Sequence, residues 1–455
     1  MDECQNQSVS PGSGVLRIIG LQAAARSGVL YAAAADRYPG DRMSFTECVM
    51  SLRPARAVRL PRRAGLMPAS PIRKLVPYAD QARARGVHIH ALNIGQPDIE
   101  TPPEMLQAYR DFTGPVLAYG HSAGLLEYRQ ALGRYYRAHG IAVTADEILV
   151  TTGGSEALLF ALLATCETGD NVLVPEPFYT NYLGFAVMAG VEVRALPTRA
   201  EDGFHLPPRT VVEAKIDART RAILYSSPGN PTGTVFARAE LSMLRDVALE
   251  HGLFVIADEA YREFIYDGAK HTSLFHLEGI SDRGILVDSV SKRFSACGAR
   301  VGCLLTHNRE IYDLVLRFGQ ARLCPPTVDQ LAAQAALTAP AAYFDTTRHE
   351  YQARRDALVA ALTEVPGVRC TRPAGAFYLM ATLPVDDSER FAQWMLEDFA
   401  LDGKTVMMAP GAGFYATPGV GGQEVRLAYV LRCEDLLDAV RVLAAGLAEY
   451  PGRVS

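Results

Sequence analysis

The hydrophobic pattern in the middle of the chain alternates between short, continuous apolar runs and helical segments. Such runs are typical of buried parallel strands. They cover residues 147–152, 220–226, 253–257 and 284–287. Residues 156–166 are apolar nearly all round, which predicts a buried helix, and residues 237–250 carry apolar positions on one face up to Gly252. This alternation predicts an α/β domain with a mostly parallel sheet flanked by helices over residues 115–345.

The pattern changes in the last quarter of the chain. It predicts a helix near residues 349–363, strands near 376–382 and 424–430, and a final helix. This mixture predicts a second, smaller α+β domain over residues 346–455. Residues 67–114 form an N-terminal segment that we expect to join the smaller domain.

Residues 1–66 show no sustained hydrophobic pattern, and they contain nine arginines but no lysine or histidine. We expect an extension that is disordered or upstream of the true start, with Met43, Met50 and Met67 as alternative starts. A signal peptide fits badly because arginines interrupt the only apolar stretch. A transit peptide is the alternative, and the acidic residues of the segment argue against it.

Composition narrows the class of protein. With 455 residues, 49% of them hydrophobic and 21% charged, the chain is typical of a globular protein with a sizeable core. The net charge of −5 offers no basic field to nucleic acid, and no apolar run reaches the length of a membrane span. The eight cysteines form no CxxC pair, so we expect reduced thiols and a cytoplasmic protein.

Lysine is rare in this chain. Only five of the 45 basic residues are lysines: Lys74, Lys215, Lys270, Lys292 and Lys404. Four of them lie in polar or helical surface contexts. Lys292 instead follows a buried apolar run in a turn rich in serine and glycine, so it is the candidate for chemistry that needs an amine.

Polar residues collect at the ends of four predicted strands, where open parallel sheets bind ligands. The first strand ends in Gly153-Gly154-Ser155, which opens a helix and offers free N–H groups to an anion. The second ends in the turn 227–233, whose prolines and glycines hold Asn230 rigidly. Taken alone, each feature fits an ordinary turn or loop at least as well.

The third and fourth strand ends carry ionisable groups. The third ends in Asp258, followed by Tyr261, and a carboxylate there either pairs with a cation or caps a helix. The fourth leads to Lys292, with Arg300 eight residues further on. Together the four ends supply a phosphate cradle, an acid for a protonated ring nitrogen, a phenol and an amine for a Schiff base. This combination predicts a site for pyridoxal phosphate.

Three motifs carry a strong resemblance to a known family: SPGNPTG (227–233), DEAY (258–261) and SVSKRFSACGARVG (289–302). In this order and spacing they resemble the class I/II, fold-type-I pyridoxal-phosphate aminotransferases. NIGQPDIETPP (93–103) and TTGGSEAL (151–158) are most similar to the bacterial subgroup loosely grouped with aspartate aminotransferases. The resemblance implies the type I fold of these enzymes, a large α/β domain plus a smaller α+β domain.

The resemblance also implies a role for each residue of the cofactor site. Lys292 would form the internal aldimine and then move the proton between Cα and the cofactor C4′, and Asp258 would pair with the pyridinium nitrogen. Tyr261 and Asn230 would hydrogen-bond the phenolic oxygen of the ring, and Tyr179 would stack on its face. The phosphate would be held by Gly154, Ser155, Ser289 and Arg300, and from the partner subunit by Tyr119.

For the substrate, the resemblance assigns Arg426, in EVRLAYV (424–430), to the α-carboxylate, with a backbone contact from Gly95. Taken alone, Arg426 also fits a surface strand arginine. Arg322 is the candidate for the distal carboxylate of a dicarboxylic substrate, in a segment that lines the partner's site in this family. If Arg322 points elsewhere, alanine, aromatic or branched amino donors fit as well as aspartate or glutamate.

The expected activity is the ping-pong transfer of an amino group from an L-amino acid, with aspartate or glutamate favoured, to a 2-oxo acid such as 2-oxoglutarate. A homodimer with shared active sites is expected. The alternative is a pyridoxal-phosphate-dependent lyase that eliminates a carbon–sulfur or related bond. A cofactor-binding regulator is disfavoured because residues 1–66 contain no helix-turn-helix pattern.

Two further motifs carry little weight. Residues 411–416 match a relaxed GxGxxA pattern, but the glycines and the proline that follow argue against a helix start and a dinucleotide site. His88 and His90 share one face of a short predicted strand without acidic or cysteine partners nearby, so no metal is expected.

Overall fold

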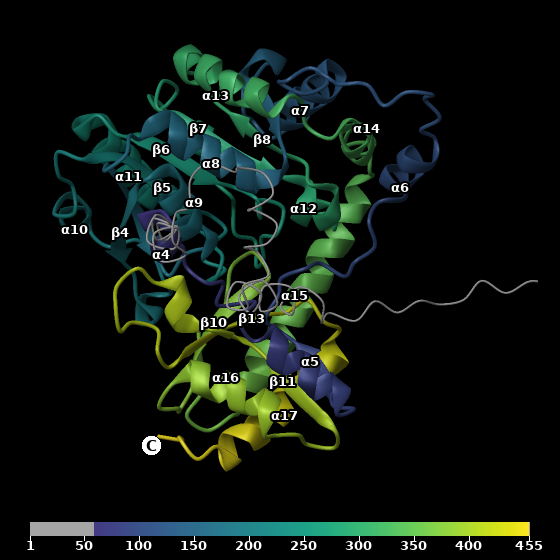
Figure 1. Ribbon diagram of the computed structural model, residues 1–455, viewed down its shortest axis with the longest axis vertical. Helices are drawn as coiled ribbons and strands as arrows, with labels where there is room; N and C mark the ends of the chain where they lie inside the picture. The colour runs from purple at the N-terminus through teal and green to yellow at the C-terminus, as the bar shows by residue number, and fades with distance from the viewer. Residues whose placement is uncertain (1–58, 455) are drawn as a thin grey trace, which may run out of the picture. The chain divides into compact units, whose positions relative to one another are not determined.

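The structure is a computed structural model that describes residues 59–454 (Figure 1). Most of the expected N-terminal extension, residues 1–66, therefore lies outside the described residues. Its last part carries the short helix α4 (Arg62–Leu66). No helix in the described part of the chain is long and apolar enough to cross a membrane.

A seven-stranded sheet forms the larger part of the fold. Its strands, in spatial order, are β2 (Ile148–Thr151), β8 (Gly302–Leu305), β7 (Gly284–Ser289), β6 (Phe254–Asp258), β5 (Thr220–Ser226), β3 (Asn171–Glu176) and β4 (Glu192–Pro197). Strand β8 runs antiparallel to both its neighbours, and all the others run parallel to one another. Strands β3 and β7 are buried at every position, as strands covered on both faces must be. The predicted α/β fold with a mostly parallel sheet is confirmed.

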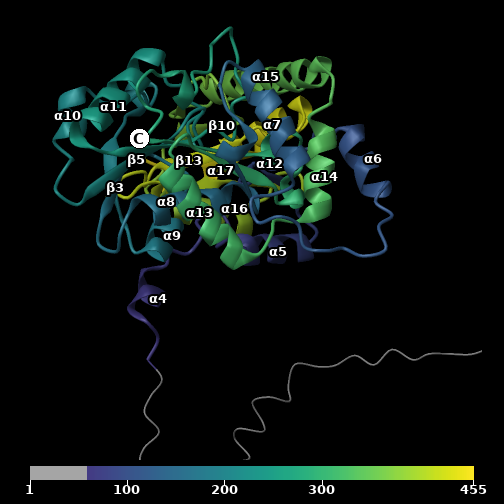
Figure 2. The same ribbon diagram turned by 90° about the horizontal axis from the view of Figure 1, so that it is seen from above.

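Helices cover both faces of this sheet (Figure 2). On one face lie α8 (Gly153–Thr165), α9 (Asn181–Ala189) and α13 (Arg309–Arg322). On the other lie α7 (Leu126–Ala138), α10 (Arg209–Glu213), α11 (Arg238–His251) and α14 (Thr327–Ala336), with α6 (Pro103–Arg110) packed on α14. Helix α8 is largely buried, as its apolar sequence predicts.

The remaining strands form two smaller sheets. An antiparallel sheet contains β12 (Ala409–Pro410), β13 (Glu424–Ala428), β10 (Tyr378–Thr382) and β9 (Arg369–Cys370). A parallel pair joins β1 (His88–Ala91) to β11 (Lys404–Met407). Except for β12, these strands share one buried apolar cluster with α5 (Val76–Ala84), α16 (Ser388–Glu397) and α17 (Cys433–Glu449). An N-terminal segment therefore completes the C-terminal part of the fold.

One long helix, α15 (Ala341–Thr363), runs between the two groups of strands (Figure 1). Its second half packs in the cluster of the smaller sheets, and Tyr343 and Phe344 in its first turn pack against a cluster of the large sheet. The helix begins earlier than the expected residue 349. Its first two turns are mostly exposed or half-buried, so they carry no apolar periodicity that could mark the start.

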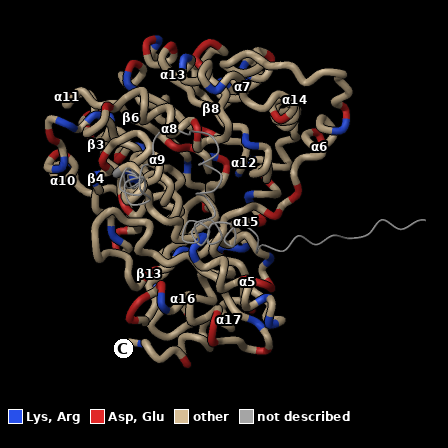
Figure 3. The backbone as a smooth tube through the Cα atoms, viewed as in Figure 1, with Lys and Arg blue, Asp and Glu red and all other residues tan. Residues whose placement is uncertain are grey.

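The charged residues of both signs are interspersed along the described chain (Figure 3). Many of them form ion pairs at the surface, such as Arg309 with Asp313. Exposed pairs of this kind contribute little to stability.

Candidate active site

A cavity of about 550 Å³ lies at the carboxyl ends of β5, β6 and β7. All the residues predicted for cofactor and substrate line it, except Tyr119 and Arg322. The large sheet and the short helix α12 (Val290–Arg293) supply Asp258 and Lys292, whereas Arg426 comes from β13. The edge at which the strands end is where an open parallel sheet places its ligand.

The start of α8 forms a cradle for an anion. Gly153 has a φ of +74°, and a Cβ there would lie 2.4 Å from Arg300 Nη2, so only glycine leaves room for this guanidinium. Arg300 is held in turn by a hydrogen bond to the carbonyl of Cys297 at 3.1 Å. Ser289 Oγ donates to Ser291 Oγ at 2.8 Å, and both residues line the cavity. A guanidinium, two hydroxyls and a helix N-terminus together suit a phosphate group.

Lys292 projects its amine into the same cavity. Its Nζ donates to the carbonyl of Gly95 at 2.7 Å, and Cys297 Sγ lies 3.6 Å away. Gly95 is required at this position because a Cβ would lie 1.9 Å from the hydroxyl oxygen of Tyr378. An amine held by a carbonyl rather than by a carboxylate is available to condense with an aldehyde.

Asp258 is the last residue of β6, and its carboxylate is buried. Tyr182 donates to Oδ2 at 2.7 Å and the N–H of Ala260 donates to Oδ1 at 3.2 Å. Burial outweighs these two donors and raises the pKa of Asp258 to about 6. A protonated ring nitrogen beside this carboxylate would supply a positive charge and lower its pKa again.

A phenol and an amide provide hydrogen-bond donors near these groups. The hydroxyls of Tyr261 and Tyr378 lie 2.9 Å apart, and burial raises the pKa of Tyr261 well above its usual range, so the phenol stays protonated. Asn230 Oδ1 accepts a hydrogen bond from Arg426 Nη1 at 2.9 Å. The amide nitrogen of Asn230 is therefore the group left to donate.

Arg426 is a buried cation, only 2% exposed, on β13. It donates to Asn230 Oδ1 at 2.9 Å and to the carbonyl of Asn93 at 2.5 Å, and it lies over the rings of Tyr378 and Phe414. Within residues 59–454 its Nε has no hydrogen-bond partner and no carboxylate pairs with its guanidinium. Burial therefore lowers the pKa of Arg426, because no carboxylate offsets the loss of solvent around the guanidinium. An isolated buried charge is costly, so this site is suited to a ligand carboxylate.

Two predicted residues lie outside the cavity of their own chain. Tyr119 is 81% exposed. Arg322 donates from Nε to Glu156 Oε1 at 3.2 Å and from Nη2 to the carbonyl of Val150 at 3.1 Å. The roles predicted for both residues therefore depend on a partner subunit, and they stay predictions.

Besides Ser291 of the phosphate cradle, sequence reasoning missed three further residues that line or support this cavity. Tyr182 supports Asp258, Tyr378 bridges Tyr261 and Gly95, and Arg73 lines the cavity. Tyr182 follows Tyr179 at helical spacing, a signal that could have revealed it. Tyr378 and Arg73 give no such signal, because they meet the site only through tertiary packing.

The two minor motifs form no further site. Residues Gly411–Phe414 form a single 3₁₀ turn, which is too short to bind a dinucleotide as an α-helix start would. His90 Nε2 pairs with Asp438 at 3.0 Å, a partner that the sequence did not reveal. No group of three or more potential metal ligands occurs within the described residues.

The residues present fit an aromatic aldehyde that carries a phosphate. Lys292 supplies the amine, Asp258 the partner for a protonated ring nitrogen, and the start of α8 with Arg300 the phosphate cradle. Two observations favour this assignment. A Cβ at Gly153 would fill the cradle, and the buried carboxylate of Asp258 is held by two neutral donors. The fold and the cavity thus define an enzyme that uses pyridoxal phosphate.

Comparison with known proteins gives the family. Residues 87–442 match the family aminotransferase class I and II, and the chain belongs to this family of pyridoxal-phosphate-dependent enzymes. It is 33% identical over 371 residues to an aspartate/prephenate aminotransferase of Thermus thermophilus, covering 80% of this chain and 92% of the relative. It is 30% identical over 380 residues to aromatic-amino-acid aminotransferase 2 of Thermococcus litoralis, covering 82% and 94%.

Solved structures of aminotransferases have the same fold as this chain. The aspartate aminotransferase of Thermus thermophilus with maleate matches with a TM-score of 0.78 and 31% identity, over 86% of this chain and all of that one. An alanine aminotransferase of Pyrococcus furiosus also matches with a TM-score of 0.78, at 30% identity, over 85% and 99%. The predictions of the fold, the aminotransferase family and the cofactor are confirmed, and the lyase alternative is not favoured.

Proposed function

We propose that the protein transfers the amino group of an L-amino acid of the aspartate or glutamate type to a 2-oxo acid such as 2-oxoglutarate. Arg426 carries this proposal, because it is a buried cation with no anionic partner among the described residues and it lines the cavity of Lys292. The α-carboxylate common to amino acids and 2-oxo acids supplies the missing charge. Relatives described as aspartate aminotransferases support the choice of substrate.

The residues of the cavity divide the work of this reaction. Pyridoxal phosphate, when bound, draws electrons from the bonds around the substrate Cα. Asp258 would hold the proton of the ring nitrogen in place, which would favour that electron flow. Lys292 would be the base that takes the proton from the substrate Cα and delivers it to the cofactor carbon C4′. Arg426 holds the carboxylate in both half-reactions, so the amino acid and the oxo acid compete for one site.

We propose that this cavity joins two domains. The large domain, residues 115–345, carries Asp258 and Lys292. The smaller one, residues 346–455, carries Arg426, and residues 67–114 join it through β1. Both domains would then be needed for the reaction, because the large one holds the cofactor and the smaller one holds the substrate carboxylate.

The distal carboxylate of a dicarboxylic substrate needs a second cation. We propose two candidates, Arg322 of the partner subunit, as the resemblance implies, and Arg73 of the same chain. Arg73 is exposed and lines the cavity. The backbone N–H of Arg73 donates a hydrogen bond to Ser70 Oγ at 3.3 Å. Asn93 Nδ2 donates to the carbonyl of the preceding Ile72 at 3.4 Å, which ties this turn to the segment beside Gly95.

A panel of amino donors against 2-oxoglutarate tests the proposal. We expect wild type to prefer aspartate over alanine, because a second cation pairs with the distal carboxylate. In Arg73→Ala or Arg322→Ala, whichever residue reads that carboxylate, kcat/KM for aspartate falls about 10- to 100-fold while alanine is unaffected. Alanine serves as the internal control since it has no distal carboxylate. Ammonia and pyruvate release without an oxo acid would overturn the proposal in favour of a lyase.

We propose that the working unit is a homodimer. Three residues of one loop support it: Val116, Leu117 and Tyr119 are 73%, 64% and 81% exposed. Apolar side chains so exposed on one short segment favour burial against a second copy. We expect sedimentation equilibrium to give about twice the 49.4 kDa of one chain, and a monomer at assay concentration would contradict the proposal.

We also propose a cytoplasmic location. The six cysteines among the described residues are all free thiols, which suits a reducing compartment. Recovery of the activity in the cytoplasmic fraction of lysed cells tests this, and recovery outside the cytoplasm would contradict it.

A further inference from the structure

Four residues of the site each have a buried charged residue as a neighbour in the chain. Glu259 follows Asp258, Arg262 follows Tyr261, Asp288 precedes Ser289 and Arg293 follows Lys292. No more than 6% of any of these four charged residues is exposed, and none of them lines the cavity. Together with Glu263 they form what we call the buried charge layer: Glu259, Arg262, Glu263, Asp288 and Arg293.

The layer and the cavity lie on different faces of the sheet at β7. Asp258 is in register with Val287 on the neighbouring strand, so their side chains share a face. Asp288, the next residue, points to the opposite face, where it meets Tyr136 of α7. Lys292 and Arg293 are consecutive residues of the single turn of α12, and their side chains also point in different directions. Lys292 lines the cavity, whereas Arg293 pairs with Asp288.

Asp288 and Arg293 form the centre of the layer. The Arg293 guanidinium forms a buried ion pair with Asp288 Oδ2. The same oxygen accepts a hydrogen bond from the hydroxyl of Tyr136 at 2.7 Å, and Oδ1 accepts one from the N–H of Ser289 at 2.6 Å. Cys303 of β8 lies against Tyr136 at 3.3 Å, and burial raises its pKa to about 12, so it stays neutral.

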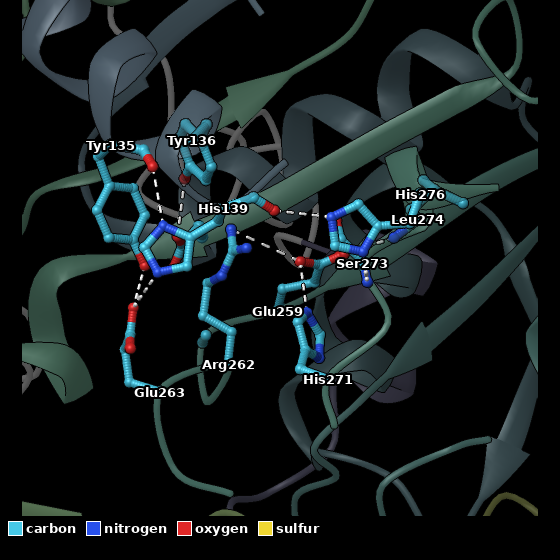
Figure 4. Close-up of polar contacts among 12 residues, drawn as sticks. Tyr135, Tyr136, His139, Glu259, Arg262, Glu263, His271, Ser273, Leu274 and His276 are labelled. Carbon is cyan, nitrogen blue, oxygen red and sulfur yellow. Dashed lines mark hydrogen bonds and ion pairs between the residues drawn. The ribbon is translucent and has the colours of Figure 1, made fainter. Parts of the chain in front are cut away.

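Glu263 and Tyr135 complete the surroundings of Arg293. The guanidinium lies 4.2 Å from the centre of the Tyr135 ring, and its Nε lies 3.7 Å from Glu263 Oε1. Tyr135 donates a hydrogen bond to the same Glu263 oxygen (Figure 4). His139 of α7 faces Glu263 at 3.8 Å. Arg293 is therefore fixed from α7 and from the segment after β6 at once.

The other end of the layer lies beside Asp258. Arg262 Nη1 is 3.8 Å from Glu259 Oε2, and His271 Nε2 is 2.9 Å from the same oxygen (Figure 4). Ser273 Oγ and the N–H of Leu274 each donate to Glu259 Oε1 at 2.8 Å. These partners hold the pKa of Glu259 low, at about 2, despite its burial.

We propose that Arg293 is a positioning residue: by pairing with Asp288 behind the sheet, it fixes the turn that carries Lys292 and offsets a negative charge that would otherwise act on Asp258. This inference rests on the proposed use of Lys292 and Asp258. A buried ion pair stabilises a fold no better than apolar residues of the same volume, so stability alone gives no reason for charges here. The reason is instead their place beside Lys292 and Asp258, the two ionisable groups of the site.

The direction of the electrostatic effect follows from the groups that face Asp258. Tyr182 and the N–H of Ala260 favour its charged form, whereas the charges of Asp288 and Glu259 add to burial in raising its pKa. Without Arg293, the charge of Asp288 acts on the site without compensation. It should then raise the pKa of every proton-binding group of the loaded site, including the chromophore on Lys292.

Three variants of the full-chain holoenzyme test this: Arg293→Met, Asp288→Asn and the double variant. The readouts are the midpoint of the pH titration of the bound cofactor's absorbance and the affinity for pyridoxal phosphate. We expect Arg293→Met to raise the midpoint by about one pH unit and Asp288→Asn to lower it. In the double variant, which removes both charges, we expect a return to the wild-type midpoint. Arg309→Met is the matched control, because Arg309 also lies over a tyrosine ring and pairs with an aspartate, but at the surface.

The opposite signs keep the test decisive even if Arg293→Met fails to fold. A wild-type midpoint in Asp288→Asn, or a double variant displaced as far as a single one, would overturn the inference. Loss of stability in the single variants with unchanged midpoints would show a purely structural role and would overturn it as well. A wild-type protein that takes up no pyridoxal phosphate would instead refute the proposed function.

Discussion

Lys292→Ala is expected to abolish both transamination and the covalent attachment of pyridoxal phosphate. Among residues 59–454, Lys292 is the only lysine that lines the cavity. Loss of a general base alone lowers kcat by about 10²- to 10⁴-fold, and loss of the covalent link to the cofactor adds to this. Borohydride reduction followed by peptide mass analysis checks it, because wild type gains the mass of the cofactor on the peptide that contains Lys292 and the variant gains none.

Lys270→Ala is the matched control. Lys270 is an exposed lysine between β6 and β7 of the large sheet, and it does not line the cavity. Both activity and the borohydride-trapped cofactor should survive this change. A Lys292→Ala enzyme within tenfold of wild type, or cofactor trapped on another lysine, would show that the site has been assigned to the wrong amine.

Arg426→Met is expected to lower kcat/KM by about 10²- to 10³-fold for amino acids and 2-oxo acids alike. Both kinds of substrate share the α-carboxylate that this guanidinium is proposed to bind. The cofactor-free variant should also gain stability, by about 1 kcal/mol, because the isolated buried charge is costlier than the two hydrogen bonds that it makes. Steady-state kinetics and denaturant unfolding of the same preparations measure the two effects.

Arg426→Lys separates charge from geometry. Lysine keeps the positive charge but lacks the planar fork that grips a carboxylate through two parallel hydrogen bonds. We expect it to recover part of the activity and none of the stability gained by Arg426→Met. Unchanged KM values for both substrates in Arg426→Met would contradict the assignment of the α-carboxylate to this residue.

The fold was largely predictable because its strands are buried on both faces. Such strands appear as unbroken apolar runs, and those of β5, β6 and β7 were found within one or two residues of their ends. The rule that parallel strands present ligands at their carboxyl ends indicated Asp258, Lys292 and the start of α8. Tyr179, Ser289 and the role of each residue came from the family resemblance. The scarcity of lysine reduced the candidates for a Schiff base to five, and the position after a buried strand left Lys292.

The rest depends on contacts that no local pattern encodes. Arg426 and Asn230 meet across 196 positions of chain, and Tyr378 and Gly95 across 283. The buried pair of Asp288 and Arg293 was hidden for another reason. Charged residues are rarely buried, so the sequence gives no reason to expect Asp288 and Arg293 inside the fold, where they contact Tyr136 and Tyr135.

The pairing of β1 with β11 sets the order in which the protein can be assembled during translation. His88 lies opposite Lys404, so 316 further residues must be synthesised before β1 finds its neighbour. At ribosomal rates this takes roughly 15 to 60 s. The large sheet is complete well before then, whereas the carbonyl of Asn93 still lacks its hydrogen-bond donor, Arg426. A nascent chain can thus display Lys292 on a folded sheet before it has any means of holding a substrate.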